Sequence, residues 1–133
     1  MEIYKLTATE LAKMIQNKEI TSEEVTKSFL DRIEKTEDKI GAFSNVFSEK
    51  AIESAKNIDN DNNDGKMGNY KNPLLFGVPV ALKDNILSEG DLTTASSQIL
   101  KNYVGVYDST VVKKLKKAGV VIVGKANMDE FAM

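Results

Sequence analysis

The chain has 133 residues, of which 41% are apolar and 29% charged, and its 18 basic and 20 acidic residues give a formal net charge of −2. This is the composition of an ordinary globular domain, and the mixed charges provide no basic surface for nucleic acid. Because the sequence has no histidine and no cysteine, it excludes a Ser-His-Asp triad, a disulfide framework, thiolate chemistry and the usual zinc sites.

The first forty residues predict a helical hairpin over residues 7–38. Thr7 and Glu10 have the spacing of a capping box, and the same device recurs at Thr21 and Glu24. Apolar residues at helical spacing follow each box, so each segment predicts an amphipathic helix. Such a hairpin is a packing element, and it is also the natural docking surface for a partner protein.

Two further elements are predicted before the middle of the chain. Residues 41–47 alternate in part and indicate a short strand, and residues 51–58 carry apolar positions at helical spacing. The stretch from Asn57 to Pro73 is rich in Asn, Asp, Gly and Lys, so it predicts an exposed polar loop over residues 57–73.

Residues 76–124 have the pattern of a βαβ unit. Residues 76–82 predict a buried strand, with Pro79 near its start because proline cannot donate within a ladder. A helix capped at Asp108 or Ser109 and ended by Gly119 should connect it to a second strand over residues 120–123.

Such a unit makes the two strands parallel, with a right-handed crossover. Ligands of parallel sheets bind beyond the carboxyl ends of the strands. Lys83 and Lys125 fall at those ends and are therefore the first candidate site residues. Beyond the second strand, Asn127 is predicted to cap a further helix, with Glu130 as its capping-box partner.

Three motifs, in this order, resemble those of the amidase-signature family: GVPVALKDNI at residues 77–86, TTAS at 93–96 and GKANMDEFAM at 124–133. The last motif and the helical hairpin are most similar to the branch of tRNA-dependent amidotransferase A subunits. The resemblance implies an α/β fold: a helical hairpin followed by the start of a mixed, largely parallel sheet flanked by helices. Residues 1–133 would be the N-terminal part of a single amidase domain.

The resemblance also implies a catalytic triad of a serine, a second serine in a cis peptide and a lysine. Only the lysine has a counterpart here, Lys83, and the serines are expected beyond Met133, so the chain alone is predicted to be inactive. Asp84 is expected either to support the site through hydrogen bonds or simply to cap its loop. Lys125 is expected to be structural. Ser96 and Ser97 are not expected to be nucleophiles, since no histidine can activate them.

By the same resemblance, the full enzyme hydrolyses glutamine and passes ammonia to a partner protein, which uses ATP and Mg²⁺ to convert glutamyl-tRNA to glutaminyl-tRNA. The expected partners are the B and C subunits of that complex, and tRNA would be contacted through the complex. The chain itself is expected to bind no metal or cofactor, to avoid membranes and to be cytoplasmic. Two alternatives remain: an amidase acting on another carboxamide, and a truncated, non-catalytic interaction module.

Overall fold

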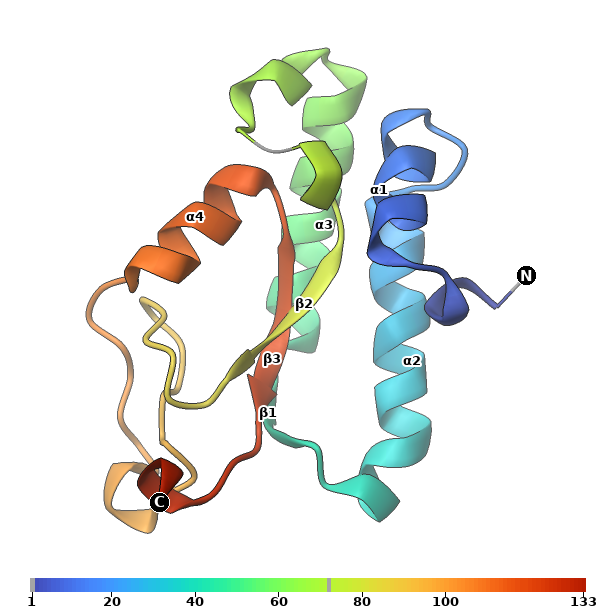
Figure 1. The fold of residues 1–133 in the computed structure, drawn as a ribbon. Helices are drawn as coiled ribbons and strands as arrows, with labels where there is room; N and C mark the ends of the chain where they lie inside the picture. The colour runs from blue at the N-terminus through green and yellow to red at the C-terminus, as the bar shows by residue number, and fades with distance from the viewer. Residues whose placement is uncertain (1, 72) are drawn as a thin grey trace.

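The computed structural model describes residues 2–71 and 73–133, and within them it shows an α/β fold (Figure 1). The helices are α1 (Ala8–Gln16), α2 (Ser22–Ile40), α3 (Ser48–Asn63) and α4 (Thr110–Ala118), and the strands are β1 (Phe43–Val46), β2 (Pro79–Lys83) and β3 (Val121–Ala126). The α1–α2 hairpin stands on one side of the sheet, and α4 stands with the long loop after β2 on the other. The predicted fold class is confirmed.

Both helices of the hairpin begin at the predicted capping boxes. The Thr7 hydroxyl accepts from the Glu10 amide, and the Thr21 hydroxyl accepts from the Glu24 amide at 3.1 Å. The start of α2 has a second partner, because the Asp59 carboxylate of α3 accepts from the first two amides of the helix, at 2.7 and 3.0 Å. A carboxylate at this end also suits the helix dipole, so α3 fixes α2 in place through polar contacts as well as packing.

The predicted polar loop over residues 57–73 is wrong in its first part. Helix α3 continues to Asn63, and short 3-10 turns follow at Lys66–Asn69 and Pro73–Leu75. Asn72 lies outside the described residues. The helix persists because Ala55, Ile58 and Asn62 keep the spacing of one buried face. The Asn62 amide donates to the Ile15 carbonyl at 2.8 Å, so a polar residue completes the face that composition alone assigned to a loop.

The sheet has the order β1-β3-β2, with β3 in the centre. Strands β2 and β3 are parallel, as the βαβ pattern predicts, and β1 runs antiparallel to β3. Pro79 is the first residue of β2, later than the predicted start at residue 76, because Gly77 adopts a φ of 75° that a strand cannot continue. β3 extends to Ala126, beyond its predicted end at residue 123, since β1 pairs with its last three residues.

The register between β2 and β3 shifts by one residue between Val80 and Ala81. Val80 pairs with Ile122 and Leu82 pairs with Lys125, so Val123 has no partner on β2. Side chains alternate along β2, which places Val80 and Leu82 on one face, and their partners share that face. Ile122 and Lys125 therefore point to the same side of the sheet although they are three residues apart. The bulge is what re-aims Lys125.

The apolar core lies between the three N-terminal helices and the sheet. Its buried members are Leu11, Ala12, Ile15, Val25, Ala51, Ala55, Ile58, Phe76, Val78, Val121 and Val123. They come from α1, α2, α3, β3 and the segment that enters β2, so the hairpin, α3 and the sheet form one packed unit. No helix in the described ranges is long and apolar enough to cross a membrane.

Candidate functional site

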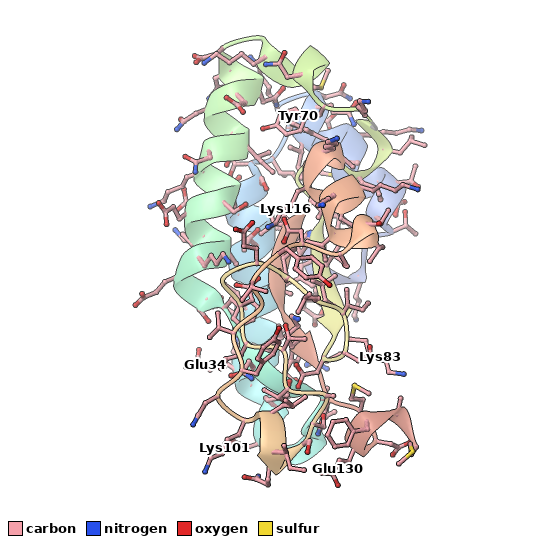
Figure 2. The ribbon with its side chains drawn as sticks, turned by 90° about the vertical axis from the view of Figure 1, so that its left-hand side faces the viewer. Glu34, Tyr70, Lys83, Lys101, Lys116 and Glu130 are labelled. Atoms are coloured by element: carbon pink, nitrogen blue, oxygen red, sulfur yellow. The ribbon has the colours of Figure 1, made fainter. Side chains whose placement is uncertain are left out.

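Lys83 is the last residue of β2, at the carboxyl end of the strand where the sequence predicts it. Its backbone pairs with Ala126 of β3, and its carbonyl accepts a hydrogen bond from the Ile86 amide at 2.9 Å. The Lys83 side chain is exposed and projects away from the body of the molecule (Figure 2). The chain turns sharply at residues 83–86, so the amine stands on the first residue of a tight turn. Residues 83–97 are called the lysine loop below.

Asp84, the next residue, points inward and is fully buried. Its carboxylate accepts hydrogen bonds from the Thr94 amide at 2.9 Å, from the Thr94 hydroxyl and from the Ser96 amide at 3.3 Å. Burial raises the pKa of Asp84, but hydrogen bonds from Thr94, Ser44 and Ser96 outweigh it and hold the pKa below its ordinary value. Asp84 is therefore an ionised group that binds the two ends of the lysine loop together.

The far end of the lysine loop is strained and tied to the C-terminal segment. Ala95 and Ser96 both have left-handed backbone conformations, with φ of 49° and 51°, which cost energy in residues with a β-carbon. The Ser96 hydroxyl donates to the Asn127 side-chain oxygen at 2.8 Å, and the Ser97 hydroxyl donates to the Glu130 carboxylate at 2.6 Å. Both serines are thus occupied as structural hydrogen-bonding groups.

The same contacts overturn the predicted capping box at Asn127 and Glu130. The residue that precedes the short terminal 3-10 turn, Glu130–Ala132, is Asp129. Asn127 spans two loops, since it accepts from Ser96 and donates to the Gly41 carbonyl at 3.2 Å. Long-range partners compete successfully with the local cap.

Lys125 of β3 is fully buried, and its ammonium group lies under the lysine loop. It donates to the Ile86 carbonyl at 2.5 Å and to the Thr93 hydroxyl at 3.0 Å. Burial lowers the pKa of Lys125, and the negative charges of Asp84 and Asp91 oppose that shift. The sequence places Lys125 at a strand end but does not predict its burial. The burial depends on the bulge that redirects its side chain, and residue types alone do not reveal a bulge.

A second buried carboxylate, Asp91, lies in the same loop and was not singled out in the sequence. It accepts from the Ser88 hydroxyl at 2.5 Å and pairs with the ammonium of Lys50 on α3. Asp84, Asp91 and Lys125 therefore form a buried charged network with their hydroxyl partners. Its only sequence signal was the density of Ser, Thr and Asp between two apolar strands.

A hollow of about 340 Å³ opens beside this network. The residues that line it include Ser44, Thr94, Ser96, Lys101 and Asn127. Lys83 is not among its lining residues. Among the described residues, no group of three or more acidic side chains is arranged to hold a metal ion.

Most of the chain, including the lysine loop, matches a known family. Residues 24–133 match the family described as Amidase. The chain belongs to the Amidase family. Membership of this family confirms the resemblance inferred from the three motifs.

Individual relatives of this Amidase-family chain are longer proteins. It is 50% identical over all of its length to one of them, a glutamyl-tRNA(Gln) amidotransferase A subunit of Clostridium acetobutylicum, and the match covers 27% of that protein. The chain thus spans about a quarter of the length of the curated relatives it matches.

Solved structures of the Amidase family share this fold. The native peptide amidase of Stenotrophomonas maltophilia matches with a TM-score of 0.86 at 28% identity, over 96% of this chain and 26% of that one. The glutamyl-tRNA(Gln) amidotransferase A subunit of Thermotoga maritima matches with a TM-score of 0.72 at 35% identity, over 100% of this chain and 25% of that one. Both matches show the fold of this chain, and each covers about a quarter of the solved structure.

Proposed function

We propose that the chain is the N-terminal quarter of a glutamine-hydrolysing amidotransferase A subunit, in which it contributes Lys83 to the catalytic triad. The observation that carries this proposal is the 50% identity, along the whole chain, with the A subunit of a glutamyl-tRNA(Gln) amidotransferase. The position of Lys83 at the carboxyl end of a parallel strand supports it, because functional groups of α/β sheets gather at that edge.

In the proposed reaction, the amine of Lys83 accepts a proton from one serine, which accepts a proton from a second, nucleophilic serine. That serine attacks the side-chain carbonyl of glutamine, and the tetrahedral intermediate collapses to an acyl-enzyme as the proton returns from Lys83 through the first serine to the amide nitrogen, which leaves as ammonia. Water then releases glutamate. Both serines come from the three quarters of the enzyme that lie beyond these residues, so the 133-residue chain by itself releases no ammonia.

The proposal also assigns partners. Ammonia passes to a B subunit, which uses ATP and Mg²⁺ to amidate glutamyl-tRNA, and a C subunit completes the complex in the cytoplasm. The chain itself holds no cofactor in this scheme. Its net charge of −2 supports contact with tRNA through the partners rather than through this segment.

A chimaera tests the role of Lys83. Residues 1–133 are joined to the remaining sequence of the Clostridium acetobutylicum relative, assembled with the partner proteins of that relative, and assayed for ammonia release from glutamine. Lys83→Met is expected to lower turnover at least about 1,000-fold, since the proton acceptor is gone. The matched control Lys114→Met changes an exposed lysine of α4 and is expected to leave turnover unchanged. Near-normal turnover of a folded Lys83→Met enzyme would remove Lys83 from the triad.

A second candidate, hydrolysis of another carboxamide, is favoured by the close structural match to a peptide amidase. The same chimaera cannot decide it, because its substrate pocket would come from the relative. The natural full-length protein, assayed against glutamine and a panel of peptide and simple amides, separates the two. A clear preference for a peptide amide over glutamine would favour the second candidate.

A further inference from the structure

The group that the proposed chemistry leaves without a role is the buried ammonium of Lys125. A fully buried lysine is rare, because removing its charge from water costs several kcal/mol unless it is paired and hydrogen-bonded. Lys125 is the largest polar side chain among the fully buried residues of the described chain. The arrangement of its two acceptors, both in the lysine loop, indicates why it is there.

The first acceptor closes the turn that carries Lys83. The Ile86 amide donates to the Lys83 carbonyl at 2.9 Å, and the Ile86 carbonyl accepts from Lys125 at 2.5 Å. On the other side of the turn, the Asp84 amide donates to the Ala126 carbonyl of β3 at 3.0 Å. The backbone of the turn is therefore held at both ends by β3, once through the main chain and once through the Lys125 side chain.

The second acceptor lies at the other end of the lysine loop. The Thr93 hydroxyl accepts from Lys125 at 3.0 Å, and its neighbour Thr94 binds the Asp84 carboxylate through both its amide and its hydroxyl. The Ala95 amide donates to the Asp84 carbonyl at 3.0 Å. A single ammonium thus connects the turn at Lys83 to the Thr93–Ser97 segment, and Asp84 connects the same two segments from the opposite direction.

We propose that Lys125 is a positioning residue that holds the Lys83 turn against β3, so that the Lys83 amine is presented in one fixed place. The inference rests on the proposed function for the meaning of that placement, but the anchoring itself follows from the hydrogen bonds. The Lys83 side chain is exposed, so the precision of its placement comes from the backbone beneath it. An ångström of misplacement in a reacting group can cost about 100-fold in rate.

Kinetics of the chimaera described above test the positioning role. Lys125→Met is expected to lower kcat at least about 10-fold with KM changed less than about twofold, because the amine is misplaced while the glutamine pocket is untouched. Lys125→Arg keeps the charge and the donors and is expected to recover part of kcat. Lys114→Met is the control. A kcat for Lys125→Met equal to that of the control would overturn the proposal.

Hydrogen exchange on the same chimaera, in the absence of glutamine, tests the anchoring without any catalysis. Lys125→Met is expected to speed exchange of the Ile86 and Ala95 amides at least about 10-fold while the amides of α2 keep their rates. An equal rise throughout α2 would mean that Lys125 supports the fold in general and would overturn the proposal. If Lys125→Met fails to fold, Thr93→Val removes one acceptor and is expected to give a smaller rise at the same two amides.

The two tests separate the two proposals. If the natural full-length protein hydrolyses another amide in preference to glutamine, the proposed function is overturned, and the kcat comparison would then be made on that amide with variants of the natural protein. A local rise in exchange at Ile86 and Ala95 without any loss of kcat would overturn the positioning role while leaving the proposed function intact.

Discussion

The helical region, α1 to α3, and the lysine loop are stabilised by different kinds of interaction. The helices bury Leu11, Ile15 and Val25 in a shared apolar core, and the starts of α1 and α2 are closed by local capping boxes. The lysine loop buries charged and hydroxyl groups and satisfies them with hydrogen bonds between its own two ends and from Lys125 of β3. Apolar packing tolerates small adjustments, whereas a buried polar network fixes its members in one geometry. The candidate chemistry stands on the second kind of structure.

The largest expected effect is on the apolar side of this comparison. Ile15→Ala should lower the free energy of unfolding by about 3 kcal/mol, because Ile15 is fully buried in the core and its loss leaves a cavity. Urea denaturation followed by circular dichroism measures this. Ile40→Ala, at a side chain that is 65% exposed, is the control and should cost less than about 0.5 kcal/mol. Equal losses in the two variants would mean that the described core is not the source of stability.

On the polar side, Asp84→Asn should lower the free energy of unfolding by about 2 kcal/mol. The change keeps the shape of the side chain but removes the charge that accepts from Thr94 and Ser96, and its new donor has no acceptor in place. Asp129→Asn, at an exposed position in the C-terminal segment, is the matched control with no expected loss. If the two variants have the same free energy of unfolding, the buried network makes no net contribution to stability and the comparison fails.

The pH dependence of Asp84 sharpens the same point. Its pKa in the folded chain lies below the ordinary value of 3.8, so its stabilising effect is complete above about pH 4 and is lost as the pH falls through the folded-state pKa. The difference in unfolding free energy between wild type and Asp84→Asn should therefore be constant from about pH 5 to 7 and shrink below about pH 4. A difference that grows in acid would reverse the assigned protonation state.

The smallest expected effect concerns a helix end. Thr21→Ala removes the hydroxyl that accepts from the Glu24 amide at the start of α2 and should cost about 1 kcal/mol. Thr21→Ser retains an acceptor and should restore most of the loss. Because Asp59 also binds the first amides of α2, a loss well below about 0.5 kcal/mol would show that the long-range carboxylate is the dominant cap.

The features predictable from sequence are those that depend on neighbours along the chain. The capping boxes at Thr7 and Thr21 and the left-handed Gly119 after α4 all follow from local rules, and the structure has them. The parallel pairing of β2 and β3 also follows, because one helix connects them.

The features that sequence reasoning missed depend on partners far away along the chain. Asn62 extends α3 because its amide reaches Ile15, and Asn127 bridges two loops instead of capping a helix. The burial of Lys125 follows from a register shift, and residue types do not encode such a shift. Asp84 is expected either to support the site or to cap its loop. In the structure its carboxylate accepts hydrogen bonds from the Thr94 and Ser96 amides of that loop. Whether the catalytic group is Lys83 stays a prediction.

The bulge in β3 makes this strand sensitive to its length as well as to its composition. In a strand without the bulge but with all of its residues, Lys125 would be three places from Ile122 and would point to the opposite face. The ammonium of Lys125 would then face the apolar core instead of the lysine loop. We therefore expect a single-residue insertion between Ile122 and Lys125, which moves Lys125 by one place, to be tolerated far less well than deletion of the unpaired Val123.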